Sequence, residues 1–395
     1  MEEKNMYNFQ FENTTKVYFG MDNFEHLKDA CRSFGKKVLL VYGGGSIKRT
    51  GVYDKVVAQL SDAGMEIFEL SGVEPNPRHT TVNKGAKICR ENNVDVVLAV
   101  GGGSTIDCSK GICATALSDT DDVWDLVERK VPYDKALPLI TIVTIAATGS
   151  EMDTGAVISN MDKNIKSGIM NDILRPKVTF EVPEFTFSVP KYQTACGSVD
   201  IMSHLFDVSY FSAQEEMSMI KGMEEELLRT VVKFAPIAFH EPENYEARAN
   251  LMWASSWALN SFLTCGIRHM TVCHMLEHEL SAFYDITHGH GLAIVTPRWL
   301  RYILNDETAK DIYRFGINVM GVSKEMEEKE GALASIEALE KFFFETLELK
   351  STLTDLGITD KDFETMADRV TAWGPIQGYT QLTKEDVLNI YKMCL

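Results

Sequence analysis

The chain has 395 residues, which is enough for two domains with separate hydrophobic cores. Hydrophobic residues make up 45% and charged residues 24%, so a disordered or collagen-like chain is excluded. The formal net charge of -18 disfavours nucleic acid as a partner. No apolar stretch reaches the roughly 20 residues of a membrane span, and the opening MEEKNMYNFQ does not resemble a secretory signal. We therefore expect a cytoplasmic protein with no membrane partner.

Two halves of the chain follow different patterns. Short β-branched runs alternate with helical stretches in the first half, at residues 37–42, 66–70, 94–100 and 137–144. This alternation predicts a parallel sheet covered by helices on both faces. Later stretches, at residues 212–239, 245–263 and 333–349, have apolar residues at helical spacing. We expect a Rossmann-like α/β domain over residues 1–188 and an all-α domain over 189–395, with the boundary in the proline-containing segment 174–190.

Two glycine-rich turns follow predicted strands. Gly101-Gly102-Gly103-Ser104 comes directly after VDVVLAV, and Gly43-Gly44-Gly45-Ser46 comes after KVLLVY. Glycines and the start of a helix can cradle a phosphate, although the turn at Gly101 could also be a tight strand-to-helix turn without a ligand. Two such turns at the carboxyl ends of parallel strands favour a dinucleotide. Lys48 and Arg49 near the first turn favour NADP(H), with NAD(H) as the alternative.

Histidines are concentrated in the second half. His274 and His278 are four residues apart, as are Asp200 and His204, so each pair would share one face of a helix. His288 follows soon after in the sequence. A carboxylate and neutral imidazoles can hold a divalent metal and leave a position open for a substrate oxygen. The pattern therefore predicts a catalytic metal site, although a single histidine is more often a structural residue.

Several segments together resemble the iron-containing (group III) alcohol dehydrogenases, especially their NADPH-dependent butanol dehydrogenase branch. They are GGGSIKRTGVYDKV, EPNP, GGGSTIDCSK, TIAATGSE, GSVDIMSH and HMLEHELSAFYDITHG. The resemblance implies an architecture shared with dehydroquinate synthase. It implies metal ligands at Asp200, His204, His274 and His288, with His278 as a proton relay. It also implies cofactor contacts at Gly44, Ser46, Asn76, Gly102, Gly103, Ser104, Asp107, Thr144, Thr148, Asp153 and Lys166.

The function implied is the interconversion of small primary alcohols and aldehydes, such as butanol and butyraldehyde. We expect a homodimer because dimers are the commonest assemblies of soluble enzymes. A bound Fe²⁺ or Zn²⁺ would polarise the substrate oxygen while hydride is exchanged with the nicotinamide. A glycerol dehydrogenase or dehydroquinate synthase activity on the same fold remains open, as does a non-catalytic metal-binding scaffold. The segment His274 to His278 also matches the HxxEH motif of zinc peptidases. The role of His290 is open.

Overall fold

The computed structural model describes residues 7–211, 217–267 and 271–395, and the described residues divide into two compact units. The sheet unit comprises Glu12–Val189 and Glu243–Met252. The helical unit comprises the described residues of Met1–Phe11, Pro190–Pro242 and Trp253–Leu395. The expected fold class, an α/β parallel-sheet region followed by an all-α region, is confirmed.

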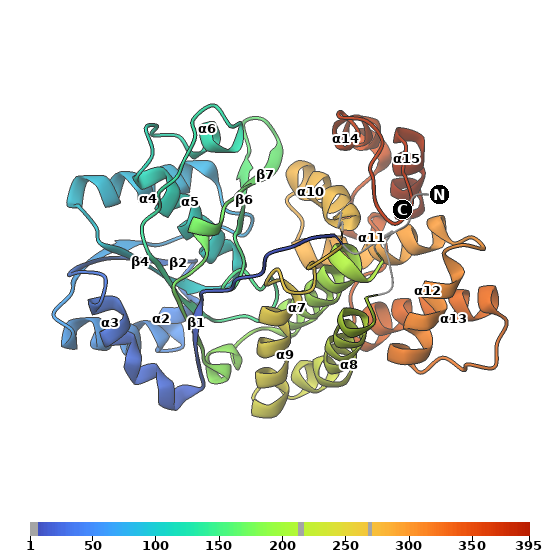
Figure 1. Cartoon of the computed structure of the whole chain (residues 1–395), viewed down its shortest axis with the longest axis horizontal. Coiled ribbons are helices and arrows are strands. Elements are labelled where there is room, and N and C mark those ends of the chain that lie inside the picture. Colours follow the sequence, from blue (N-terminus) through green and yellow to red (C-terminus); the bar gives the residue numbers. More distant parts are fainter. Residues whose placement is uncertain (1–6, 212–216, 268–270) are drawn as a thin grey trace. The chain divides into compact units, whose positions relative to one another are not determined.

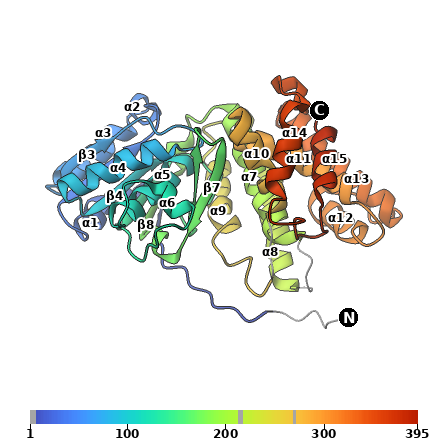
Figure 2. The same ribbon diagram turned by 90° about the horizontal axis from the view of Figure 1, so that it is seen from above.

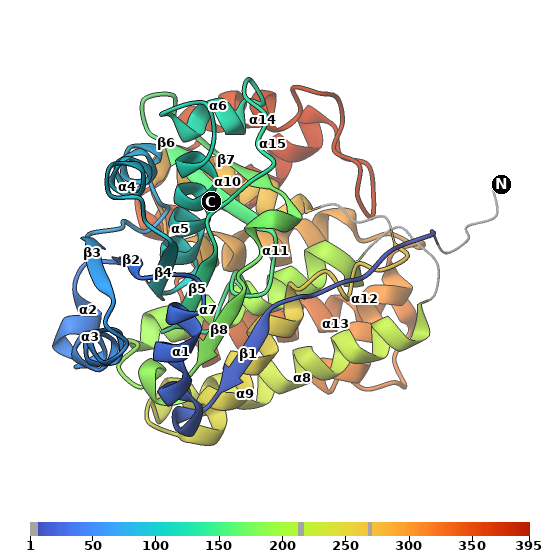
Figure 3. The same cartoon turned by 60° about the vertical axis from the view of Figure 1, so that its left-hand side comes forward.

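Among the described residues, the sheet unit contains a six-stranded parallel sheet in the order β1-β8-β5-β4-β2-β3 (Figure 1). Its strands are β1 Lys16–Phe19, β2 Lys37–Tyr42, β3 Glu66–Leu70, β4 Val96–Gly101, β5 Leu139–Val143 and β8 Val178–Glu181. Four of them fall where β-branched runs predicted strands. The sequence did not predict β1 and β8, which pair at one side of the sheet (Figure 3). An antiparallel pair, β6 Gly155–Asn160 and β7 Ile165–Met170, was also not predicted.

Helices cover both faces of the sheet because alternate strand residues point to opposite sides. On β2, Val38 and Leu40 pack with the helices α1 and α3, whereas Leu39 and Val41 pack with α4 and α5. The helices of this unit are α1 Leu27–Arg32, α2 Ser46–Arg49, α3 Val52–Asp62, α4 His79–Asn92, α5 Gly103–Ala116 and α6 Val123–Val127, with short 3-10 segments η1 Met21–His26, η2 Asp172–Leu174 and η3 Pro183–Thr186.

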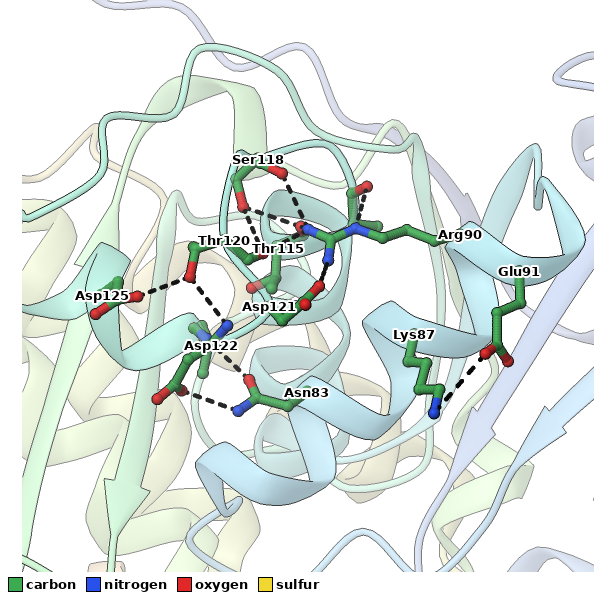
Figure 4. A network of polar contacts seen from close by, with 12 residues as sticks. Asn83, Lys87, Arg90, Glu91, Thr115, Ser118, Thr120, Asp121, Asp122 and Asp125 are labelled. Carbon is green, nitrogen blue, oxygen red and sulfur yellow. Dashed lines mark hydrogen bonds and ion pairs between the residues drawn. The ribbon is translucent and has the colours of Figure 1, made fainter.

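The carboxyl end of α5 is anchored by Arg90 of α4 (Figure 4). The Arg90 guanidinium donates to the carbonyl oxygens of Ala116, at 3.1 Å, and Ser118, at 3.0 Å. It also donates to the carbonyls of Thr115 and Thr120 and pairs with Asp121. The last carbonyls of a helix have no partner within the helix, and this one side chain satisfies two of them, Thr115 and Ala116, together with two carbonyls of the following turn.

The helical unit consists of packed helices and short π and 3-10 turns (Figure 2). Its elements are α7 Lys191–His204, η4 Leu205–Tyr210, α8 Ser218–His240, α9 Tyr245–Ala258, α10 Val272–Tyr284, α11 His288–Ile303, α12 Ala309–Phe315, η5 Gly316–Met320, α13 Glu328–Lys341, η6 Phe342–Thr346, η7 Thr354–Leu356, η8 Asp360–Asp362, α14 Phe363–Val370 and α15 Lys384–Met393. The first residues of α9 are assigned to the sheet unit. Residues 212–216 of the predicted helix 212–239 lie outside the described residues. Among the helices of the described chain, none has the length and apolarity of a membrane span.

Candidate functional site

Three helices of the helical unit bring four of the predicted site residues together. Asp200 and His204 lie on α7, His274 lies on α10, and His288 is the first residue of α11. The Nε2 atoms of His204, His274 and His288 lie 3.8, 3.9 and 3.6 Å from the same Asp200 oxygen, Oδ1. Asp200, His204 and His274 are buried, whereas the His288 side chain is 23% exposed. The cluster therefore has one side that is open to solvent.

Two glycines allow these helices to approach closely. A Cβ atom on Gly289 would lie 2.1 Å from the carbonyl oxygen of Cys196, one turn before Asp200 on α7. A Cβ atom on Gly291 would lie 2.7 Å from Cγ of Glu277 on α10. Only residues without a side chain fit at these two crossings, so the sequence His-Gly-His-Gly at the start of α11 positions His288 beside both neighbouring helices.

The donor set fits a divalent metal. Distances of 3.6 to 3.9 Å are too long for hydrogen bonds, but ligand atoms about 2.1 Å from one tetrahedral ion lie about 3.4 Å apart. Nε2 of His274 is buried and has no hydrogen-bond partner among the described residues. Burial, together with His274 and His288, holds the pKa of His204 well below its usual range, so this imidazole is neutral. Neutral imidazoles beside a buried carboxylate are the form in which these groups bind a metal.

Two carboxylates that the sequence analysis did not select orient the histidines. Oδ2 of Asp207 accepts hydrogen bonds from the backbone N–H of His274, at 2.8 Å, and from its Nδ1, at 2.9 Å. Glu277, which is fully buried, pairs with Nδ1 of His288. A hydrogen bond at Nδ1 fixes the ring and leaves Nε2 to face the ion. Asp207 lies on the π-helix η4, which begins directly after His204.

The remaining histidines have different surroundings. The His278 ring centroid lies 5.7 Å from that of His288 and 6.4 Å from that of His274, so His278 borders the cluster. His290 points elsewhere: its Nδ1 bonds the Tyr192 hydroxyl at 3.0 Å, and its Nε2 bonds the Lys350 carbonyl at 2.9 Å. Both ring nitrogens of His290 are therefore engaged in structural contacts.

The first glycine turn of the sheet unit lies between β2 and α2. Gly44 and Ser46 are exposed, and a Cβ atom on Gly44 would meet nothing within 4 Å. Asn76 is buried and has a left-handed backbone with φ of 52°. Beside the turn, Lys48 lies over the Tyr53 ring and 3.9 Å from Glu69 at the end of β3. The carboxylate of Glu69 therefore partly neutralises one of the two cations that favoured NADP(H).

The second glycine turn lies against another predicted cofactor segment. Gly102 is the N-cap of α5, and Ser104 is the second residue of the helix. A Cβ atom on Gly102 would lie 2.2 Å from Ile145, and one on Gly103 would lie 2.3 Å from Thr148. The backbone N–H of Thr144 donates to the Gly101 carbonyl at 3.0 Å. These glycines are thus required by the packing of the chain on itself, a reason that the sequence analysis did not consider.

Three charged residues of the predicted cofactor set lie together behind this turn. Oδ1 of Asp107 accepts from the Ser150 hydroxyl at 2.6 Å, and its Oδ2 accepts from the Val157 N–H at 2.9 Å. Asp153 pairs with Lys110, which is fully buried and was not selected from the sequence. Lys166 is buried on β7, and its charge acts on Asp107. Both carboxylates are therefore engaged within the protein.

A parallel sheet with two glycine turns and a buried aspartate–histidine cluster on helices define the class of metal-dependent, dinucleotide-linked dehydrogenases. The model for "Iron-containing alcohol dehydrogenase" matches residues 14–181, and that for "Fe-containing alcohol dehydrogenase family, C-terminal" matches residues 194–395. The chain belongs to the iron-containing alcohol dehydrogenase family. Membership implies a nicotinamide dinucleotide and a metal ion.

Relatives match over nearly the whole chain. NADH-dependent butanol dehydrogenase A of Clostridium acetobutylicum is 49% identical over 98% of this chain and 99% of its own length. NADPH-dependent aldehyde reductase YqhD of Escherichia coli is 33% identical, with 94% and 95% covered. The crystal structure of NADH-dependent butanol dehydrogenase A from Thermotoga maritima has a TM-score of 0.93 at 37% identity, covering 99% of this chain and 100% of that one. The chain is an NAD(P)-dependent alcohol dehydrogenase.

Proposed function

We propose that this enzyme interconverts butanol and related short primary alcohols with their aldehydes, using NADH and one Fe²⁺ held by Asp200, His204, His274 and His288. The observation that supports the metal site most strongly is the convergence of three imidazole Nε2 atoms on one buried carboxylate oxygen. The substrate class is supported by the names of relatives at 49% and 47% identity, both butanol dehydrogenases. Zn²⁺ suits the same ligands, and elemental analysis of the purified protein distinguishes the two metals.

The roles of the protein side chains follow from their positions. When bound, the metal would polarise the substrate oxygen, and the nicotinamide would exchange hydride with the substrate carbon. Asp207 and Glu277 hold the rings of His274 and His288 in the orientation that presents Nε2. His278 borders the cluster without belonging to the proposed ligands, so it can hold or pass the proton of the substrate hydroxyl.

The dinucleotide would contact the sheet unit at the glycine turns and the segments beside them. The proposed contacts are Gly44, Ser46, Asn76, Gly102, Gly103, Ser104, Asp107, Thr144, Thr148, Asp153 and Lys166. The glycines, Ser46, Ser104 and Thr144 lie at or near the carboxyl ends of parallel strands, where open α/β sheets bind ligands, whereas Lys166 lies on the antiparallel strand β7. The Asp107 carboxylate is engaged by Ser150 and Val157, and that of Asp153 by Lys110. Asp107 and Asp153 would therefore act mainly by shaping the site.

The choice of NADH departs from the sequence-based expectation of NADP(H). Hydrogen bonds from Tyr42 and Tyr53 hold the pKa of Glu69 below its usual range, so its carboxylate is charged. A carboxylate near the first glycine turn disfavours a 2′-phosphate. Arg49, whose guanidinium lies 3.9 Å from the Cβ position of Gly45, is the cation that NADPH would use. The ratio of kcat/KM for NADH to that for NADPH tests this choice.

The activity is tested by measuring NADH oxidation with butyraldehyde and other straight-chain aldehydes, before and after metal removal and reloading with Fe²⁺ or Zn²⁺. We expect oxidation that depends on the metal. A dehydroquinate synthase-like lyase would recycle its cofactor and show no net NADH consumption. A non-catalytic scaffold would bind NADH without turnover. The peptidase alternative is disfavoured because Glu277 is fully buried and paired with His288.

A cytoplasmic homodimer is the expected form of the enzyme. The eight cysteines are buried free thiols, which suits a reducing compartment. Closed dimers are the commonest assemblies of soluble enzymes. Light scattering coupled to size-exclusion chromatography measures the assembly directly, and a monomeric mass would reject the dimer.

A further inference from the structure

Lys110 is a buried cation with an unusual concentration of acceptors. It lies on α5, and its side chain has no exposed surface. Its Nζ donates to the Ser150 hydroxyl at 3.0 Å, the Asp153 carbonyl at 3.2 Å and the Gly155 carbonyl at 2.8 Å, and it pairs with the Asp153 carboxylate. An ammonium group has three N–H donors, so four acceptors use its full capacity. A buried charge persists only with such compensation.

Asp107 adds a second attachment of α5 to the same segment. It lies three residues before Lys110, on the same side of the helix. Its carboxylate accepts from the Ser150 hydroxyl at 2.6 Å and from the Val157 N–H at 2.9 Å. The Ser150 hydroxyl therefore accepts from Lys110 and donates to Asp107. Together, the two charged residues fix residues 150–157 along α5.

The segment held in this way continues into the loop that packs on the second glycine turn. Oγ1 of Thr148 accepts from the Ser150 N–H at 3.2 Å, which links the loop to the attachment. The Cβ positions of Gly102 and Gly103 lie 2.2 and 2.3 Å from Ile145 and Thr148, so the loop and the turn have no spare space. A shift of Ser150 would therefore move Thr148 relative to the amides of the turn.

The charges behind the turn form a small balanced set. The charge of Asp107 is opposed by Lys110 and Lys166, and that of Asp153 is opposed by Lys110. Burial raises the pKa of Asp153 to about 6, and Lys110 opposes that shift. Without Lys110, Asp153 would lose the cation that opposes the effect of burial on its carboxylate.

We propose that Lys110 is a positioning residue for the cofactor: it fixes the loop of Thr144 and Thr148 against the second glycine turn. This inference rests on the proposed NADH-linked function. Lys110 would act only through the residues that it holds, so it is not a catalytic residue.

The test compares Lys110→Met with Arg90→Met in the full-length enzyme. Both substitutions remove a cation that anchors α5, Lys110 near its glycine turn and Arg90 at its carboxyl end. We expect Lys110→Met to raise the Kd and KM for NADH by about tenfold or more, since displacements near 1 Å have large effects, and to change kcat less at saturating NADH. Arg90→Met should lower thermal stability and leave the Kd for NADH unchanged.

A second variant keeps the test decisive if Lys110→Met does not fold. Lys110→Met combined with Asp153→Asn removes the uncompensated carboxylate, and it should fold yet still bind NADH weakly. Unaltered NADH affinity in folded Lys110→Met, or an equal loss in Arg90→Met, would overturn the positioning role. If wild-type enzyme itself binds neither NADH nor NADPH, the proposed function is wrong, which is a different result.

Discussion

Replacing Gly289 with Ala perturbs the metal cluster through the packing of α11 on α7. The added Cβ atom would lie 2.1 Å from the Cys196 carbonyl oxygen and 2.6 Å from its carbon, and both belong to backbone that cannot rotate away. Ordinary contact requires a separation of about 3.5 Å, so the Cβ atom and the carbonyl oxygen must move apart by about 1.4 Å. His288 and Asp200 lie on these helices. Metal–ligand distances tolerate about 0.2 Å, so this displacement should remove His288 from the ligand set.

The assay for Gly289→Ala is metal content after dialysis against a weak chelator, with thermal unfolding and NADH affinity measured in parallel. We expect metal affinity to fall by about a hundredfold or more, the scale reported for disturbed metal surroundings. The matched control is Gly222→Ala on α8, where an added Cβ would meet nothing within 4 Å. The substitution Gly222→Ala should raise the free energy of unfolding by up to about 1 kcal/mol, because Ala favours a helix more than Gly. Full metal retention in Gly289→Ala, with wild-type stability, would show that close packing at Gly289 is not needed to position His288.

Four other substitutions test separate parts of the structure. Asp207→Asn weakens the partner of His274 and should lower metal affinity about 10- to 100-fold by metal titration; unchanged affinity would exclude the orienting role. Burial raises the pKa of Glu224 from 4.5 to about 7, so wild-type stability falls as pH rises through that window. Glu224→Gln should therefore gain up to about 3 kcal/mol over wild type between about pH 5 and about pH 8 in urea unfolding, and a pH-independent difference would contradict this. Glu69→Gln should shift the ratio of kcat/KM values towards NADPH. An unchanged ratio would show that the Glu69 carboxylate does not disfavour NADPH. Arg90→Met should lower the free energy of unfolding by about 2 kcal/mol or more, because several carbonyls lose their hydrogen-bond donor. An unchanged free energy of unfolding would show that water replaces the guanidinium as the donor.

The long, strongly patterned elements could be predicted from the sequence, whereas short ones could not. The run at 37–42 coincides with β2, where Val38 to Tyr42 are all buried, and the run at 66–70 coincides with β3, an edge strand in which only Leu70 is buried. The strand β8 has only four residues and lies inside the segment 174–190, where the prolines drew attention to breaks between elements. The predicted helix at 245–263 ends earlier, at Ala258, and the one at 333–349 becomes α13 followed by the π-helix η6. Such ends depend on tertiary packing.

Some of the site residues could likewise be predicted from the sequence, and others could not. Spacing of four residues on a helix placed Asp200 beside His204 and indicated that a second pair could meet them, and the four proposed ligands do lie together. Asp207 and Glu277 were missed because their role depends on which ring nitrogen they face, and that is set by the crossing of helices. Each follows a histidine by three residues, and this spacing was the available signal. For Lys110, the signal was a lysine followed by the mostly apolar residues of Gly111 to Ala116, which are buried throughout.

The most direct test of the central claim is anomalous diffraction from crystals of the enzyme loaded with Fe²⁺, with data collected on both sides of the iron absorption edge. We expect one iron peak bounded by the Asp200 carboxylate and by Nε2 of His204, His274 and His288. A peak among Glu277, His278 and His288, a second group of the described residues that could hold a metal, would contradict this expectation, as would stoichiometric iron bound elsewhere in the protein.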